Sequence, residues 1–120
     1  MDREKAIDEA KFSSGELREA LVERHSEETQ QKLEQGRVAI AGLGGLGSNV
    51  AIALTRIGVG HLHLLDFDRV DLTNLNRQQY FLDQVGRYKT EALSETLQRI
   101  NPYLDIRFDT VKITDENIQE

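Results

Sequence analysis

Glycines near the middle of the chain have the types and spacing of a phosphate-binding loop. Residues 42–47 read Gly-Leu-Gly-Gly-Leu-Gly. A backbone without Cβ atoms turns tightly and lets a phosphate come close, and the free N–H groups of a following helix attract an anion. The spacing therefore predicts phosphate binding at Gly42, Gly44, Gly45 and Gly47. The alternative is a loop that is rich in glycine for packing alone.

Two acids follow the next apolar run. Asp66 and Asp68 come directly after residues 62–65, about 20 residues beyond the glycines, where an acid usually binds ribose hydroxyls. We expect Asp66 to have this role because it stands nearest the strand end. A turn-capping acid is the alternative reading for each residue.

Amide and guanidinium groups lie further along the chain. Asn74, Arg77 and Gln78 occupy the polar segment 69–86, and their donors suit a triphosphate as well as a solvated loop. Lys89 opens a helix, a position where the helix dipole disfavours a cation. A neighbouring phosphate would explain that lysine.

The elements that position these residues follow from the apolar pattern. It predicts an apolar helix and three strands, the first of them buried on both faces: residues 48–57 for the helix, and 38–41, 62–65 and 106–109 for the strands. A further helix runs from Lys89 to Ile100, ended by Asn101-Pro102. The fold class is α/β: a Rossmann-like doubly wound sheet, of which the chain holds the first βαβαβ half. The usual strand order, 3-2-1, leaves the first strand on an edge.

The chain divides into a helical N-terminal arm, residues 1–36, and a nucleotide-binding half-domain, residues 37–120, which we expect to be truncated. The arm holds ten acidic and six basic residues. Ser13 and Glu16 fit a capping box, and the charges indicate a solvated helix face or an arm that packs on a partner subunit. Near the other end, Thr114-Asp115-Glu116 predicts the start of another helix.

Composition limits the function classes. The net charge of −6, with no basic cluster, argues against nucleic acid as the main partner. Without cysteine the chain has no cysteine-ligated zinc and no cysteine nucleophile. His61 and His63 alternate with leucines and are expected to fill strand positions, so no metal ligand is predicted here. No apolar run approaches membrane-spanning length, and we expect a cytoplasmic protein without membrane contact.

Five motifs occur together in one order, and the sequence resembles the E1-like adenylyltransferases of the ThiF, MoeB and HesA type, most of all short ThiF-type proteins. The motifs are Gly42-x-Gly44-Gly45-x-Gly47-Ser48, Asp66-x-Asp68, Asn74-x-Asn76-Arg77-Gln78, Gly86-x-x-Lys89 and Ile100-Asn101-Pro102. The resemblance implies ATP- and Mg²⁺-dependent adenylation of the C-terminal glycine carboxylate of a small ubiquitin-like sulfur-carrier protein (ThiS-like). Pyrophosphate is released, and the pathway is thiamine biosynthesis or a related sulfur transfer.

The same resemblance implies roles for individual residues. Arg77 and Lys89 would neutralise the triphosphate and are the expected catalytic residues. The expected nucleotide-binding residues are Gly42, Gly44, Gly45, Gly47, Asp66, Asn74 and Gln78.

Three features depart from the family pattern. Arg24-His25-Ser26-Glu27-Glu28 matches the family's Arg-Tyr-x-Arg-Gln loosely, with glutamate where an arginine would reach a partner's ATP in a homodimer. The metal-binding aspartate is expected beyond Glu120, and so are zinc-binding and sulfur-transferring cysteines. We therefore expect the 120-residue chain to bind nucleotide weakly and to be inactive, the activity belonging to a longer parent.

Rival readings are a non-catalytic E1-like scaffold subunit and an NAD-dependent oxidoreductase domain. The acidic charge disfavours an RNA-modifying relative of the same fold. The unpaired first strand also predicts self-association of the chain, unless residues 1–36 fold back over its edge.

Overall fold

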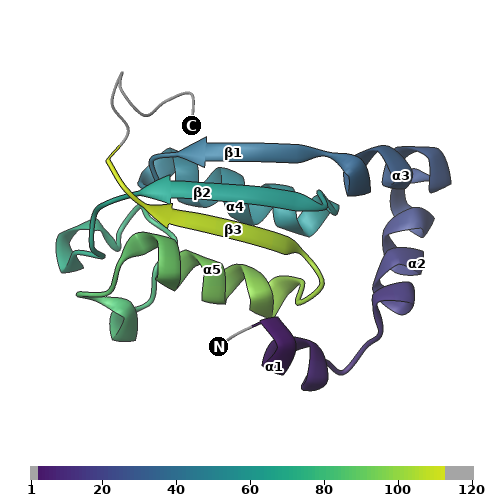
Figure 1. Cartoon of the computed structure of the whole chain (residues 1–120), viewed down its shortest axis with the longest axis horizontal. Helices are drawn as coiled ribbons and strands as arrows, with labels where there is room; N and C mark the ends of the chain where they lie inside the picture. The colour runs from purple at the N-terminus through teal and green to yellow at the C-terminus, as the bar shows by residue number, and fades with distance from the viewer. Residues whose placement is uncertain (1–2, 113–120) are drawn as a thin grey trace.

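Three parallel strands form the centre of the structure, a computed structural model that describes residues 3–112. They lie side by side in the order β1 (Arg37–Ala41), β2 (His61–Asp66) and β3 (Asp105–Thr110) (Figure 1). Ala39 is level with His63, and His63 with Arg107. The first βαβαβ half of a Rossmann-like sheet, with its first strand on an edge, is therefore confirmed.

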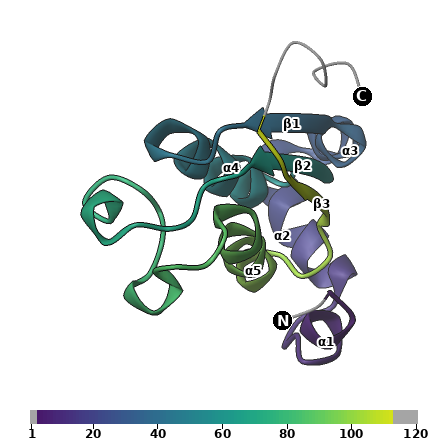
Figure 2. The same ribbon diagram turned by 60° about the vertical axis from the view of Figure 1, so that its left-hand side comes forward.

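Two helices connect the strands and cover one face of the sheet. Helix α4 (Gly45–Ile57) leads from β1 to β2, and α5 (Lys89–Ile100) leads to β3. Figure 2 shows both helices on the same side of the sheet. The core lies between these layers and contains Ile40, Leu43, Ala51, Val59, Leu62, Leu64, Val70, Tyr80, Ala92, Leu93, Leu97 and Leu104.

The prediction that the first strand is buried on both faces is wrong for this chain. In β1 only Ile40 is buried, whereas Ala39 and Ala41 are exposed. Side chains alternate between the two faces of a strand, and the described residues supply helices to one face only. The strand therefore carries apolar side chains on a face that no helix among residues 3–112 covers.

Helix α4 begins earlier than its apolar pattern predicts, at Gly45 instead of residue 48. Its apolar side chains surround more of the circumference than the sheet can cover, so Leu46 is 82% exposed and Ile57 is 46% exposed. Gly58, in the left-handed conformation, ends the helix.

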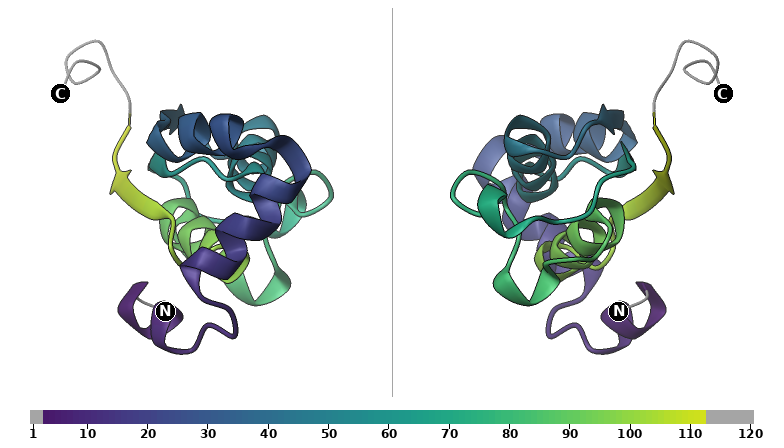
Figure 3. Two further views of the ribbon diagram at one scale, coloured as in Figure 1. Left: turned by 90° about the vertical axis from the view of Figure 1, so that its right-hand side faces the viewer. Right: turned by 90° about the vertical axis from the view of Figure 1, so that its left-hand side faces the viewer.

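The arm forms three helices, α1 (Arg3–Asp8), α2 (Ser14–His25) and α3 (Glu27–Gln35). The capping box of Ser13 and Glu16 is present. Helices α2 and α3 lie at the amino ends of the strands, away from the outer edge of β1 (Figures 1 and 3). The side-chain amide of Gln30 in α3 lies close to Gly58 at the end of α4, and the Gly36 carbonyl accepts from the His61 amide at the start of β2. The arm therefore does not fold back over β1.

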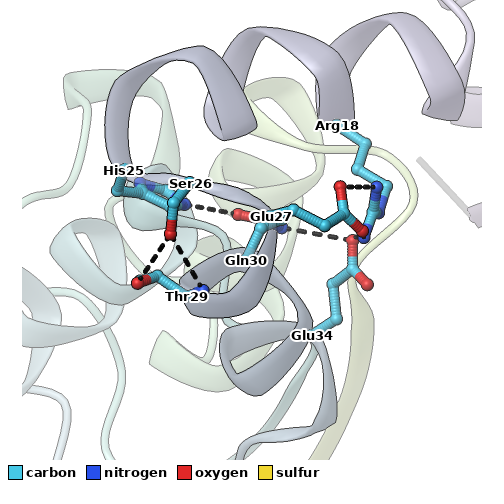
Figure 4. A network of polar contacts seen from close by, with 7 residues as sticks. All are labelled: Arg18, His25, Ser26, Glu27, Thr29, Gln30 and Glu34. Atoms are coloured by element: carbon cyan, nitrogen blue, oxygen red, sulfur yellow. Dashed lines mark hydrogen bonds and ion pairs between the residues drawn. The ribbon is translucent and has the colours of Figure 1, made fainter.

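Ion pairs and hydrogen bonds join α2 to α3 (Figure 4). Arg18 binds Glu27 and Glu34, each with a shortest N–O distance of 2.5 Å. Buried Gln30 receives a contact from His25 Nε2 at 2.6 Å and donates to Glu34 at 3.3 Å. Arg18 thus pairs with two of the arm's ten acidic residues and fastens α2 to α3.

The histidines occupy strand positions, as predicted. His61 Nδ1 lies 2.9 Å from Asp105 and His63 Nε2 lies 2.6 Å from Asp109, both across the β2–β3 pairing. Among residues 3–112 no group of three metal-ligating side chains comes together. Within the same residues no helix has the length and apolarity needed to cross a membrane.

The polar segment 69–86 contains two short 3₁₀ helices, η1 (Leu72–Asn74) and η2 (Leu82–Gln84). It lies at the carboxyl ends of the strands (Figure 1). The helix predicted to start at Thr114–Glu116 lies outside the described residues.

Candidate nucleotide-binding site

The chain itself requires two of the four glycines. Gly42 has φ +90°, a conformation that other residues rarely adopt. A Cβ on Gly47 would lie 1.8 Å from the Gly42 carbonyl oxygen, so α4 could not pack on the loop. These positions therefore support the packing alternative as well as a phosphate site.

Gly44 and Gly45 have no such requirement. A Cβ on Gly44 would lie 3.5 Å from Gln78 Nε2, and one on Gly45 would lie 3.7 Å from the Arg77 carbonyl oxygen, which are ordinary contact distances. The missing Cβ atoms leave space between the glycine loop and the 77–78 segment. Packing does not require glycine at these two positions, although Gly44 is also the N-cap of α4, where glycine is common. The open space is compatible with a bound group.

Several backbone donors of the glycine loop are unpaired among the described residues. The amide of Ser48 donates to the Gly44 carbonyl, but the amides of residues 44–47 donate to no group within residues 3–112. These are the unpaired donors of the first turn of α4, where the helix dipole places positive charge. An anion of the right size would satisfy them.

Asp66 holds the glycine loop to the end of β2. Its side chain is 8% exposed, and its two oxygens accept from the Leu43 amide at 2.6 Å and the Asp68 amide at 2.7 Å. These bonds are those of the turn-capping alternative. Each oxygen retains a second lone pair, and exposed Asp68 lies beside it. The ribose role of Asp66 stays a prediction.

Tyr80 fixes the loop from its other side. The hydroxyl of this buried residue donates to the Leu43 carbonyl at 2.7 Å. Burial raises the pKa of the Tyr80 phenol above its ordinary value, and the charge of Asp66 raises it further. The phenol therefore stays protonated as a hydrogen-bond donor at any physiological pH.

Arg77 is exposed, and its guanidinium contacts its own loop. It donates to Asn74 Oδ1 at 3.2 Å and to Asn76 Oδ1 at 3.3 Å. Asn74 thus orders the loop that carries Arg77, and its role in nucleotide binding stays a prediction. An exposed guanidinium held by neutral oxygens retains its full charge for an anion.

Lys89 is 5% exposed at the start of α5, and its backbone amide donates to the Asp68 carbonyl. No hydrogen bond or ion pair joins its ammonium to another residue within 3–112. Lys89 interacts electrostatically with Asp71. The hydrogen bonds of Thr73 lower the pKa of Asp71, and the charge of Lys89 lowers it further. A nearly buried ammonium without a close anion favours binding of one.

These observations fit a nucleotide. Its phosphates match the open glycine space, the free amides and Lys89. Gln78 is 7% exposed, and its Oε1 is buried without a partner among the described residues. A ribose hydroxyl or a base amino group would supply the missing donor. The assignments of Gly44, Gly45, Gln78, Arg77 and Lys89 remain predictions that this geometry supports.

Sequence reasoning did not single out two residues that shape the site, Asn49 and Tyr80. Asn49 is the one amide in an otherwise apolar stretch of helix, and that contrast was the available signal. Tyr80 carries no local signal, because its partner lies 37 residues earlier in the chain.

A parallel βαβ sheet with a glycine loop at the carboxyl end of β1 defines a Rossmann-like nucleotide-binding domain. Comparison with known proteins makes the assignment specific. The model of the ThiF family matches residues 17–120, and the chain belongs to this family. The predicted E1-like superfamily is thereby confirmed.

Curated relatives are ubiquitin-like modifier-activating enzymes. The chain is 45% identical to ubiquitin-like modifier-activating enzyme 5 of Arabidopsis thaliana over 84 residues, which cover 70% of this chain and 20% of that protein. It is 41% identical to the Drosophila persimilis protein of the same name over 103 residues, which cover 86% of this chain and 25% of that protein. The chain thus spans a fifth to a quarter of the length of these relatives.

Solved structures extend the likeness. E. coli tRNA N6-threonylcarbamoyladenosine dehydratase (TcdA) with ATP matches with a TM-score of 0.79 and 33% identity, over 82% of this chain and 41% of that one. E. coli MccB with ATP matches with a TM-score of 0.69 and 37% identity, over 72% of this chain and 26% of that one. The similar structures thus include complexes with ATP and a tRNA-modifying enzyme.

Proposed function

We propose that the parent protein adenylates a carboxylate with ATP. The substrate is the C-terminal glycine of a small ubiquitin-like protein, and the product besides the acyl-adenylate is pyrophosphate. We further propose a ThiS-like sulfur carrier and a role in thiamine or related sulfur-transfer biosynthesis. The modifier-activating relatives support the ubiquitin-like class of substrate, and the motifs of the short ThiF type support the sulfur carrier.

The observation that carries this proposal is the space at Gly44 and Gly45. It is bounded by Arg77 and Gln78, and the amides of residues 44–47 in the same loop are unpaired among the described residues. In adenylation a carboxylate attacks the α-phosphorus while negative charge builds on the phosphate oxygens. Such a reaction needs positioning and fixed positive charge more than a protein nucleophile. The chain's own residues supply both.

Each group has a stated task. Amides of the α4 first turn hold phosphate oxygens, and the rigid fork of Arg77 bridges them. Lys89 adds a point charge from the first residue of α5, and Gln78 Oε1 accepts a hydrogen bond from the nucleoside. Mg²⁺ would accompany the nucleotide and help to neutralise its phosphates. We also propose a cytoplasmic homodimer.

The test is carrier-dependent exchange of pyrophosphate into ATP by the longer parent. Arg77→Ala and Lys89→Met should each lower exchange about a hundredfold, as the loss of one preorganised charge does in other enzymes. Methionine keeps the apolar stem that buried Lys89 contributes to packing. Arg56→Ala and Lys32→Ala are matched controls, because both remove an exposed cation outside the site.

Near-normal exchange by Arg77→Ala would contradict the proposed roles. The other candidates give different results. A scaffold subunit shows no exchange with its carrier present, and the pairing of Glu27 with Arg18 is consistent with that candidate, since this position supplies no arginine. An oxidoreductase domain is stabilised by NAD and not by ATP in a thermal-shift comparison.

A further inference from the structure

Asn49 connects two segments that are far apart in the sequence. It lies in the second turn of α4 with an exposed side chain. Its Nδ2 donates to the Gly45 carbonyl at 2.5 Å and to the Arg77 carbonyl at 3.3 Å, and its Oδ1 accepts from Gln79 Nε2 at 2.8 Å. The Asn49 side-chain amide thus joins the glycine loop, residues 42–47, to the 74–80 segment that carries Arg77.

The orientation of this amide follows from its partners. Two carbonyl oxygens face one end and a side-chain NH₂ group faces the other. The reverse orientation would place oxygen against two oxygens and nitrogen against nitrogen. The bond to Gly45 alone would be an ordinary helix contact to the residue four positions earlier. The contacts to Arg77 and Gln79 go beyond that local role.

The position of Arg77 depends on hydrogen bonds that other segments make to its main chain. Its guanidinium reaches only Asn74 and Asn76 of its own loop among the described residues, and its amide bonds to the Asn74 carbonyl. The position of the 74–80 segment relative to the glycines therefore depends on other contacts, among them the bond from the Tyr80 hydroxyl to the Leu43 carbonyl and the bonds that α4 makes. Asn49 makes the side-chain bond from α4 to the Arg77 main chain, and Ser48 supports it by accepting from the Gln79 amide at 3.2 Å.

We propose that Asn49 is a positioning residue that holds the Arg77 main chain against the glycine loop. It touches no phosphate itself. Its effect on catalysis passes through Arg77, so that part of the inference rests on the proposed function. The effect of Asn49 on the position of the 74–80 segment does not rest on the proposed function.

Two variants separate hydrogen bonding from space filling. Asn49→Ala removes all three bonds, and alanine favours the helix. Asn49→Asp keeps the shape and an acceptor for Gln79 but turns an oxygen toward the carbonyls of Gly45 and Arg77. A residue that only filled space would tolerate aspartate, whereas a positioning donor would not. Gln31→Ala removes an exposed helical amide elsewhere and serves as the control.

The first measurement is amide hydrogen exchange in the 120-residue chain without nucleotide. In Asn49→Ala the amides of residues 74–80 should exchange about tenfold faster, the effect of losing roughly one hydrogen bond of net stability. The aspartate variant should exchange at least as fast, and the α5 amides should not change. Unchanged exchange of residues 74–80 in both variants would overturn the proposal.

The second measurement is pyrophosphate exchange by the parent, with Asn49→Ala in the unaltered and Arg77→Ala backgrounds. We expect about a tenfold loss in the first and almost none in the second, because coupled residues are non-additive. Equal losses in both backgrounds would show that Asn49 does not act through Arg77. If the unaltered parent shows no exchange, the proposed function fails, and the amide-exchange result still decides whether Asn49 holds the loop.

Discussion

The four glycines of the loop should respond differently to one added methyl group. At Gly47 the new Cβ would lie 1.8 Å from the Gly42 carbonyl oxygen, whereas ordinary contacts begin at 3.4 Å. The obstacle is backbone, so either the loop or the start of α4 must move by more than an ångström. At Gly45 the nearest atom, the Arg77 carbonyl oxygen, is 3.7 Å away. That position accepts a Cβ without movement.

These distances give magnitudes. Overpacking costs about 1–3 kcal/mol, and a backbone obstacle places Gly47→Ala at the upper end. In a domain of this size that loss lowers the thermal midpoint by roughly 10–20 °C. Gly45→Ala should leave the free energy of unfolding within about 0.5 kcal/mol of the unaltered chain. If phosphate approaches Gly45, the same variant should weaken ATP binding by about tenfold or more, because the methyl group occupies the phosphate space.

Thermal unfolding of the 120-residue chain, followed by circular dichroism, measures the stability effects. Calorimetric titration of the parent with ATP measures binding, with Gly44→Ala as a second test of the open space. An unchanged midpoint in Gly47→Ala would refute the packing argument. Unaltered ATP affinity in both Gly44→Ala and Gly45→Ala would show that the loop is structural only.

Two further outcomes follow from the edge strand and from one ion pair. The 120-residue chain should self-associate through the outer edge of β1, which no described residue covers, and Ala39→Lys should shift the chain toward monomer. Sedimentation at micromolar concentration measures this self-association. A monomer with protected β1 amides would contradict the prediction. The hydrogen bonds from Arg87 lower the pKa of Glu95 from 4.5 to about 2. The pair therefore stabilises the fold fully above pH 4.5, and this contribution is lost as the pH falls through about 2. Glu95→Gln should be less stable at pH 7 and should lack this part of the acid dependence of the thermal midpoint; an unchanged profile would show that the pair contributes nothing.

Local pattern was sufficient for most of the fold. The strand, glycine loop, helix, strand and acid were predicted in order because each depends on short-range features: apolar periodicity, capping by Ser13, and termination at Asn101-Pro102. The burial of β1 was mispredicted since apolarity along a strand does not tell which neighbour covers each face. That depends on elements far away in the chain.

The site divides in the same way. The sequence by itself determined which residues could bind a nucleotide, because glycine spacing and the Arg77 to Lys89 block are properties of residue type and order. Only the tertiary structure decided that Gly42 and Gly47 serve the fold while Gly44 and Gly45 stand open. It also decided that Asp66 caps the loop and that Asn49 reaches Arg77. The roles of Gly44, Gly45, Asp66 and Asn49 depend on contacts between residues more than 20 positions apart, which form only when β1, β2 and the 74–80 segment meet at the carboxyl end of the sheet. The requirement for glycine at 42 and 47 arises within the loop itself, from the conformation of Gly42 and its contact with Gly47.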